Sequence, residues 1–516
     1  MVLFPEKGAI FWELDVKRQV KNHIRWSGNN EISMQEAQMR TFSNFAWMFL
    51  RTEGDYNFSS GSRGRGNLSS TANPYFLFPQ IYNFRYNIYS SEWPVANRAI
   101  ELYLQKKSEN EGWERQINGL SNNEKANLLL EKHTFKELLA DVEQRNLQNN
   151  IVGLEASRLF ARSEINMGVD AFRDSLYAML KRNTFLNIKF ENMLDTLGEM
   201  SRTDLYSYLK EWEQLTPLPF YSIGEPELTK VVNKGGEEFF VLKVLVSNNS
   251  DYDGIIQMNV LQNGWWYQPM EDPRARKKVE IAAHTSKECV SVWEEQIRDV
   301  EINTMVSGNL PYMIRQSIGN VKQERNKIVK DTIYTLPESS LEMPGEVIVD
   351  NEDSTLFVLS TPAVVGLLPK WLDKVEDTSF KYSGISWWRA PLQWTATTNA
   401  KYYGKYIRSA YVIKSGDGSQ TATWKIPVPE AGQYELYYHV FKDDELRWND
   451  RLQGEYHFRV AYDSEMEDAY INLRKANEGW EQLGTYYFSA DTVRVVLTDE
   501  CKLRSVTADA VKIVKR

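Results

Sequence analysis

The chain has 516 residues, enough for three or four globular domains at about 150 residues each, and its hydrophobic content of 42% allows each domain a core. The formal net charge of −9 argues against a surface that binds nucleic-acid phosphates. Its two cysteines, Cys289 and Cys501, supply neither a disulfide framework nor a metal-ligand set, and no apolar run is long enough to predict a membrane-spanning helix.

The first 93 residues carry no single fold signature. The first residues lack the basic and apolar segments of a signal peptide. The sequence starts as though within a domain, so we expect the chain to be the C-terminal part of a longer protein. A helix is predicted over 34–49, because Ser33 and Glu36 have the spacing of a capping box. The polar tract 57–73, rich in Gly, Ser and Asn, predicts an exposed loop.

Residues 94–217 have the period of an α-helical domain. Apolar side chains recur three and four residues apart in four stretches: Val95, Ala99, Leu102 and Tyr103; Phe135, Leu138, Leu139 and Val142; Phe172, Leu176, Met179 and Leu180; Leu205, Tyr208, Leu209 and Trp212. Ser121 with Glu124, and Thr134 with Glu137, have capping-box spacing. We therefore predict five to seven amphipathic helices here.

After Pro217 the apolar period becomes two. Phe240, Leu242, Val244 and Val246 alternate with polar residues, and short strands with regular turns continue, which predicts an immunoglobulin-like β-sandwich over 218–340. A connector follows over 341–385, with a strand at 346–349. Its acidic turn 350–353 resembles a Ca²⁺ loop in charge, but it lacks the spaced ligands and the glycine of such a loop, so a solvated turn is the better interpretation.

Residues 386–516 alternate in the same way and predict a second all-β sandwich, of jelly-roll type. Three strands show the pattern: Tyr434, Leu436, Tyr438 and Val440; Tyr456, Phe458, Val460 and Tyr462; Val493, Val495 and Leu497. The whole chain is therefore predicted to be a multidomain α+β protein, with a helical domain followed by two β-sandwiches.

The sequence contains no complete catalytic or metal-binding set. None of the five histidines lies in an H-E-x-x-H motif, and no two stand three or four residues apart, so no zinc site follows from local spacing. His439 and His457 lie on predicted neighbouring strands and could approach each other. Each lies on the side of its strand opposite the aromatic residues, however, so both are interpreted as surface residues. We predict no catalytic residue, no metal ligand and no cofactor for this chain.

Aromatic side chains are the better candidates for function, at 13% of the chain. Flat amphipathic rings fill cores, but rings in loops also stack on sugars or anchor interfaces. The candidate platform consists of Trp387, Trp388, Trp394, Tyr402, Tyr403 and Trp448. The alternative is that these rings belong to the core, which is where we place Trp424 and Trp480.

The last domain resembles the golvesin and xanthan-lyase C-terminal domain family. Five blocks carry the resemblance in order: Tyr402–Gly404, Ala422–Trp424, Ala431–Tyr434, Trp480–Phe488 and Ala508–Val511. The resemblance implies an all-β accessory module of extracellular, often polysaccharide-active, bacterial proteins. It implies no defined catalytic residues.

Residues 95–340 resemble the C-terminal half of gluzincin metallopeptidases of the membrane alanyl aminopeptidase type. The matching residues are Gly168–Phe172, Asp204, Leu205 and Trp212, followed by the predicted sandwich. In that family the zinc ligands and the general base lie upstream of these helices. This chain lacks them, which speaks against peptidase activity in the sequence as it stands.

Three functions are compatible with these features of the sequence. The first is a non-catalytic extracytoplasmic binding protein, or the C-terminal fragment of one, that presents a β-module to a polysaccharide or peptide polymer. The second is the C-terminal portion of a zinc aminopeptidase-like protein whose H-E-x-x-H domain is upstream or lost. The third is a structural interaction module of the cell envelope, at the cell surface or in the periplasm.

Overall fold

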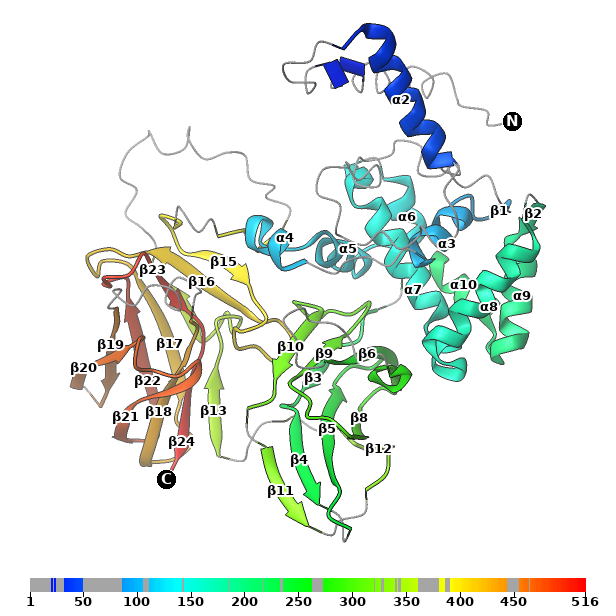
Figure 1. Ribbon diagram of the computed structural model, residues 1–516. Coiled ribbons are helices and arrows are strands. Elements are labelled where there is room, and N and C mark those ends of the chain that lie inside the picture. The colour runs from blue at the N-terminus through cyan, green and yellow to red at the C-terminus, as the bar shows by residue number, and fades with distance from the viewer. Residues whose placement is uncertain are drawn as a thin grey trace. The chain divides into compact units, whose positions relative to one another are not determined.

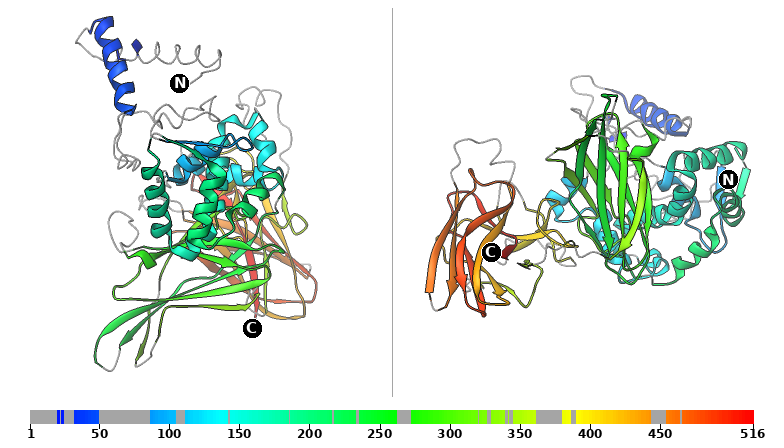
Figure 2. Two further views of the ribbon diagram at one scale, coloured as in Figure 1. Left: turned by 90° about the vertical axis from the view of Figure 1, so that its right-hand side faces the viewer. Right: turned by 90° about the horizontal axis from the view of Figure 1, so that it is seen from below.

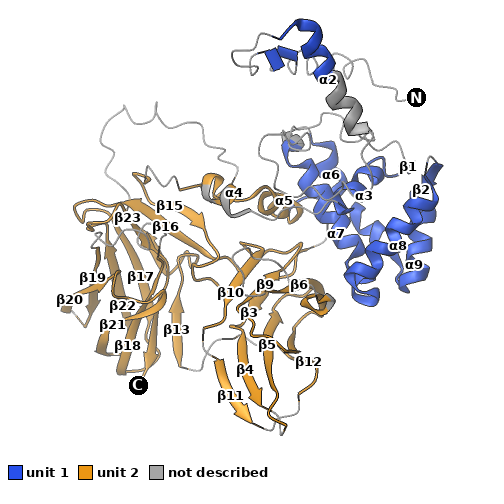
Figure 3. Ribbon diagram, viewed as in Figure 1, with its two compact units in different colours: residues 1–109, 132–216 blue, residues 110–131, 217–516 orange. Residues whose placement is uncertain are grey.

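The computed structural model describes residues 20–24 except 22, 32–49, 86–104 and 111–516, the last range apart from 142, 185, 216, 233–234, 262–271, 320, 326–328, 339–340, 342–344, 361–379, 386–389, 443–453 and 464. The chain divides into two compact units, residues 1–109 with 132–216 and residues 110–131 with 217–516 (Figure 3). The predicted loop 57–73 lies outside the described residues. No described helix is long and apolar enough to cross a membrane.

The first unit is helical, as its period predicts (Figure 1). Its elements are α2 (Met34–Phe49), β1 (Tyr86–Tyr89), α3 (Ala96–Leu104), α6 (Phe135–Ala140), α7 (Gln148–Met167), α8 (Val169–Arg182), β2 (Leu186–Lys189), α9 (Phe190–Ser201) and α10 (Leu205–Lys210). The strands β1 and β2 pair in parallel. The ring of Trp212 contacts those of Trp93 and Phe135, with centroids 5.2 and 4.7 Å apart, so the segment between β1 and α3 shares one core with the end of the unit.

The predicted helix starts are confirmed. Ser121 and Thr134 each accept a hydrogen bond from the backbone N–H three residues on, and the glutamate at that position accepts one in return. Glu36 N donates to Ser33 Oγ at 3.1 Å, which caps α2. Each cap satisfies a backbone donor that the first helical turn leaves without a partner.

The second unit begins with α4 (Glu111–Asn118) and α5 (Asn122–Leu130), which we included in the predicted helical domain 94–217. Close backbone contacts explain their place here. Asn127 Nδ2 donates to Met305 O at 3.1 Å, and Thr398 Oγ1 donates to Gly119 O at 2.8 Å. A Cβ at Gly119 would lie 2.3 Å from the Ser383 carbonyl carbon, so only glycine allows this approach.

The first β-sandwich follows and has two sheets. One has the order β10-β9-β6-β7, and the other the order β11-β4-β5-β8-β12 with β3 added beside β5. The strands are β3 (Tyr221–Ile223), β4 (Glu227–Val232), β5 (Glu238–Asn248), β6 (Gly254–Leu261), β7 (Arg276–Ile281), β8 (Thr285–Trp293), β9 (Asp299–Asn303), β10 (Met313–Ser317), β11 (Val321–Arg325) and β12 (Thr332–Pro337). The predicted alternation is confirmed, because Leu242, Val244 and Val246 are fully buried between the sheets.

The C-terminal sandwich, most of whose strands are orange or red in Figure 2, also has two main sheets. Their orders are β13-β24-β18-β21 and β14-β17-β22-β19-β20, and there is a side sheet β15-β16-β23. Its strands are β13 (Glu346–Val349), β14 (Phe357–Leu359), β15 (Thr395–Thr398), β16 (Ser409–Lys414), β17 (Thr421–Pro427), β18 (Gly432–Val440), β19 (Glu455–Tyr462), β20 (Glu465–Asn472), β21 (Gly479–Phe488), β22 (Thr492–Thr498), β23 (Ser505–Ala508) and β24 (Val511–Lys515). Both main sheets thus take an edge strand, β13 or β14, from the predicted connector.

This sandwich has the core that the alternation predicts. Tyr434, Leu436, Tyr438 and Val440 of β18 are at most 1% exposed, and Phe458, Val495 and Leu497 face them from the other sheet. The expectation that the strands of His439 and His457 are neighbours is wrong. The two histidines lie on β18 and β19, which belong to different sheets, and each alternates with the buried side chains of its strand. The multidomain α+β class is confirmed.

Candidate functional site

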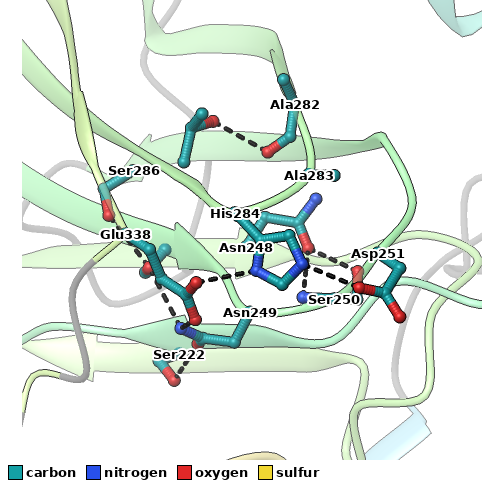
Figure 4. A network of polar contacts seen from close by, with 12 residues as sticks. Ser222, Asn248, Asn249, Ser250, Asp251, Ala282, Ala283, His284, Ser286 and Glu338 are labelled. Carbon is teal, nitrogen blue, oxygen red and sulfur yellow. Dashed lines mark hydrogen bonds and ion pairs between the residues drawn. The ribbon is translucent and has the colours of Figure 1, made fainter.

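The most prominent histidine network belongs to the first sandwich (Figure 4). His284 Nε2 lies 2.8 Å from Asp251 Oδ1, and His284 Nδ1 lies 2.8 Å from Glu338 Oε2. These two hydrogen bonds raise the pKa of His284, and the hydrogen bond from Asn249, followed by that from His284, lowers the pKa of Glu338. The carboxylates hold opposite nitrogens of one ring and do not converge on a common point, so the network ties together two turns and the segment after β12. Within the described ranges no cluster of three or more His, Cys, Asp or Glu residues is arranged to hold a metal.

The acidic turn after β13 also holds structure together. Asp353 Oδ2 accepts from the Asp350 N–H at 2.9 Å, and Glu352 Oε1 accepts from the Tyr382 hydroxyl at 3.0 Å and from Ser409 Oγ. Burial and the nearby Asp509 carboxylate raise the pKa of Asp350. These carboxylates are therefore engaged as acceptors for the surrounding chain.

The structure brings together only part of the predicted platform. Trp387, Trp388 and Trp448 lie outside the described residues. Trp394 is half-buried against the core of the last sandwich. Tyr402 is 5% exposed and packs on Phe441 with centroids 4.7 Å apart, so it offers no ring face to a ligand. Tyr403 is half-buried, and it joins a cluster that we describe next.

Three half-buried rings gather beside the outer face of β18: Tyr403, His439 and Trp480. The Tyr403 ring lies 5.0 Å from Trp480 and 5.8 Å from His439, and His439 lies edge-on to Trp480 at 5.1 Å. His439 and Trp480 are register partners on β18 and β21, which places both on the same side of the sheet. We call this group the ring cluster.

The indole of Trp480 reaches across the sheet. The ammonium of Lys512, on β24, lies 4.9 Å from the Trp480 ring centroid, although β18 separates β24 from β21. Neighbouring strands are about 4.8 Å apart, so the Trp480 ring and the Lys512 side chain together span the outer side of β18. The same ammonium lies 5.4 Å from the ring centroid of Tyr437, on β18.

A buried carboxylate fixes the ring cluster from below. Asp509 is fully buried between β23 and β24, and its Oδ2 lies 2.8 Å from His439 Nδ1. Its Oδ1 also accepts from the Tyr403 N–H at 3.1 Å. Burial raises the pKa of Asp509, while the neighbouring His439 opposes that rise. One side chain thus orients both the histidine ring and the backbone that carries Tyr403.

The loop that presents Tyr403 depends on a glycine. Asn399 N donates to Arg408 O at 3.2 Å, and Arg408 Nη1 donates to Ala400 O at 2.9 Å, which closes the loop. A Cβ at Gly404 would lie 1.9 Å from Ile407 O, so no other residue fits this approach. Gly404 thus allows the close backbone packing of the loop that carries Tyr403.

The prediction that Trp480 lies in the core is wrong, whereas that for Trp424 is confirmed, because Trp424 is fully buried. Trp480 was placed in the core because it belongs to a family block. Its register partner His439 was already assigned to the surface by alternation, and pairing the two strands would have placed Trp480 beside it. Sequence reasoning also missed Asp509, because a single acidic residue in an apolar stretch gives no partner by spacing.

The cations of this face are each neutralised by a carboxylate. Lys512 Nζ lies 2.7 Å from Glu346 Oε1, and Arg516 lies 2.9 Å from Glu435 Oε1. Lys512 and Glu346 are only 12% and 8% exposed. The face therefore presents rings, amides and hydroxyl groups with little net charge.

Comparison with known proteins supports the assignment of this domain. Residues 388–515 match the family model described as Golvesin C-terminal domain, which confirms the resemblance of the last sandwich. No curated protein matches the chain.

Solved structures give only weak likenesses. They include a Podospora anserina GH26-CBM35 β-(1,4)-mannanase (11% identity, 34% of this chain, 28% of that chain, TM-score 0.18), Bacteroides uniformis β-glucuronidase 2 (11%, 60%, 31%, 0.17) and Legionella pneumophila aminopeptidase A (13%, 44%, 23%, 0.21). The chain spans less than a third of each. At these TM-scores none of the three carries an argument about this chain.

Proposed function

We propose that this chain is an extracytoplasmic accessory protein whose last sandwich binds a polysaccharide through the ring cluster. The observation that carries the proposal is the indole of Trp480, which lies on the outer side of the sheet and is flanked by Tyr403, His439 and Lys512. A sugar ring has an apolar C–H face that stacks on an aromatic ring, and its hydroxyl groups need nearby hydrogen-bonding side chains.

The surroundings of the ring cluster favour binding over catalysis. Asp509 is fully buried beneath the rings, so it is not placed as one of two accessible carboxyl groups on either side of a glycosidic bond, which glycoside hydrolysis requires. The match of residues 388–515 to the golvesin C-terminal domain family supports an extracellular accessory role.

The test is affinity electrophoresis of the full chain through gels that contain, one at a time, xylan, mannan, a mixed-linkage β-glucan or amylose. At least one polymer should retard the wild type. Trp480→Ala should weaken that binding about 30-fold, the effect of losing about 2 kcal/mol from a stacking hot spot. Tyr470→Ala is the matched control, because Tyr470 is 58% exposed on β20, in the other sheet. Equal retardation of all three proteins would contradict the proposal.

A further inference from the structure

We infer that the binding face continues along β18 and β21 from Trp480 to Tyr487, so that it takes an internal stretch of an extended, electrically neutral polysaccharide. This inference rests on the proposed function and specifies the ligand of the same site. Tyr487 is 64% exposed, the largest exposed fraction among the exposed tyrosines of the described residues. It belongs to β21, the strand that also carries Trp480.

The two rings share a face because of a β-bulge. Trp480 and Tyr487 are seven residues apart, and in a regular strand an odd separation places side chains on opposite faces. Leu436 pairs with Gly484 but Tyr437 pairs with Gln482, so β21 holds an extra residue, Leu483, at this point. The pairs His439–Trp480 and Gln433–Tyr487 then both fall on the outer side of β18.

Burial on either side of the bulge agrees with this register. Tyr486 and Phe488 are buried in the core, whereas Tyr487 between them is exposed. At Gly484 a Cβ would lie 2.7 Å from the Tyr486 ring, so glycine lets the strand pass this ring. Because of the bulge, the side chains of Trp480 and Tyr487 lie on the same face of the sheet and mark the two ends of one surface.

The length of the surface indicates that the ligand is an internal stretch of a polysaccharide and not its terminal sugar. His439 and Gln433 are six residues apart on β18, which corresponds to about 20 Å at about 3.4 Å per residue. Several linked sugar rings are needed to cover that distance. Between the two ends lie Tyr437, whose hydroxyl donates to Glu435 at 2.7 Å, and Gln482, whose amide donates to Thr485 at 3.1 Å.

The charges of the surface indicate a neutral polymer. The described lysine and arginine on this face, Lys512 and Arg516, each lie within 2.9 Å of a carboxylate. A polyanionic sugar would have to displace one of these carboxylates before it could gain an ion pair. The chain's formal charge of −9 adds to that repulsion.

The experiment uses the full chain and titrates neutral oligosaccharides, from the disaccharide to the hexasaccharide, derived from the polymer that retards it in gels. The wild type should bind the hexasaccharide at least tenfold more tightly than the disaccharide. Tyr487→Ala should remove about tenfold from hexasaccharide binding and leave disaccharide binding unchanged, whereas Trp480→Ala should weaken both. Polygalacturonate, an anionic probe, should not retard the chain. Since Tyr487 is exposed, its variant should keep the melting temperature of the wild type.

The outcomes separate the two proposals. If Trp480→Ala weakens binding but Tyr487→Ala leaves the hexasaccharide unaffected, the proposed function holds and the extended surface is wrong. If polygalacturonate binds as tightly as the neutral polymer, the neutral ligand class is wrong. If no polysaccharide retards the chain, the proposed function fails, and this inference fails with it.

Discussion

Asp509 shows how one residue supports the ring cluster without belonging to its surface. The carboxylate is fully buried, and it accepts hydrogen bonds from a backbone N–H and from an imidazole. A buried donor left without its acceptor costs about 1–3 kcal/mol. The rings above therefore keep their positions only while this acceptor is present.

Two substitutions of Asp509 separate the contribution of its negative charge from that of its hydrogen-bond acceptors. Asp509→Ala should lower the free energy of unfolding of the C-terminal sandwich by about 2–3 kcal/mol, because it leaves the Tyr403 N–H and His439 without an acceptor. Asp509→Asn should lower it less, because the amide oxygen still accepts one of these bonds. Chemical denaturation of the full chain, followed by β-sheet circular dichroism, measures both changes. Equal destabilisation by the two variants would show that the charge, and not the acceptor, matters.

At the scale of elements, the His284 network joins three segments of the first sandwich: the turn after β5, the turn before β8 and the segment after β12. His284 itself adopts a left-handed backbone with φ of 52°, which is unusual for a side chain larger than glycine. Both ion pairs are exposed, so their contribution to stability is expected to be small and to depend on salt.

The pH dependence of this network has a definite sign. The folded state raises the pKa of His284, so its contribution is present below the ordinary value of 6.5 and is lost as the pH rises through the raised pKa. The folded state lowers the pKa of Glu338, so that contribution is present above 4.5 and is lost as the pH falls. His284→Gln should therefore lower the melting temperature more at pH 5.5 than at pH 8.5. A difference of the same size at both values would contradict this assignment.

At the scale of the whole chain, the sequence predicted the secondary structure and the buried faces of its elements better than the long-range contacts between them. The helical period over 94–217 and the alternation in both sandwiches located the cores, because burial requires a regular spacing of apolar residues. The capping boxes located helix starts for the same local reason. Long-range choices escaped this reasoning: the packing of α4 and α5 on the second unit depends on contacts of Gly119 and Asn127 with residues far away in the chain.

The site was predicted in outline only. Alternation assigned His439 to the surface, and the tyrosines of 402–403 were recognised as candidates, but only one of those two rings is available to a ligand. To predict the face on which Trp480 lies, the pairing of its strand must be known. For Tyr487 the bulge at Leu483, which shifts the register by one residue, must be known as well. Neither feature has a signature in the spacing of a single strand.

Hydroxyl-radical footprinting of the full chain tests the central claim most directly, because it reports which aromatic side chains a bound polymer covers. The measurement compares oxidation rates with and without the polysaccharide that retards the chain. Trp480 and Tyr487 should be protected by the polymer, while Tyr470, on the opposite sheet, should oxidise at an unchanged rate. Protection of Tyr470 with no change at Trp480 and Tyr487 would place the ligand on the other sheet and contradict the proposed binding face.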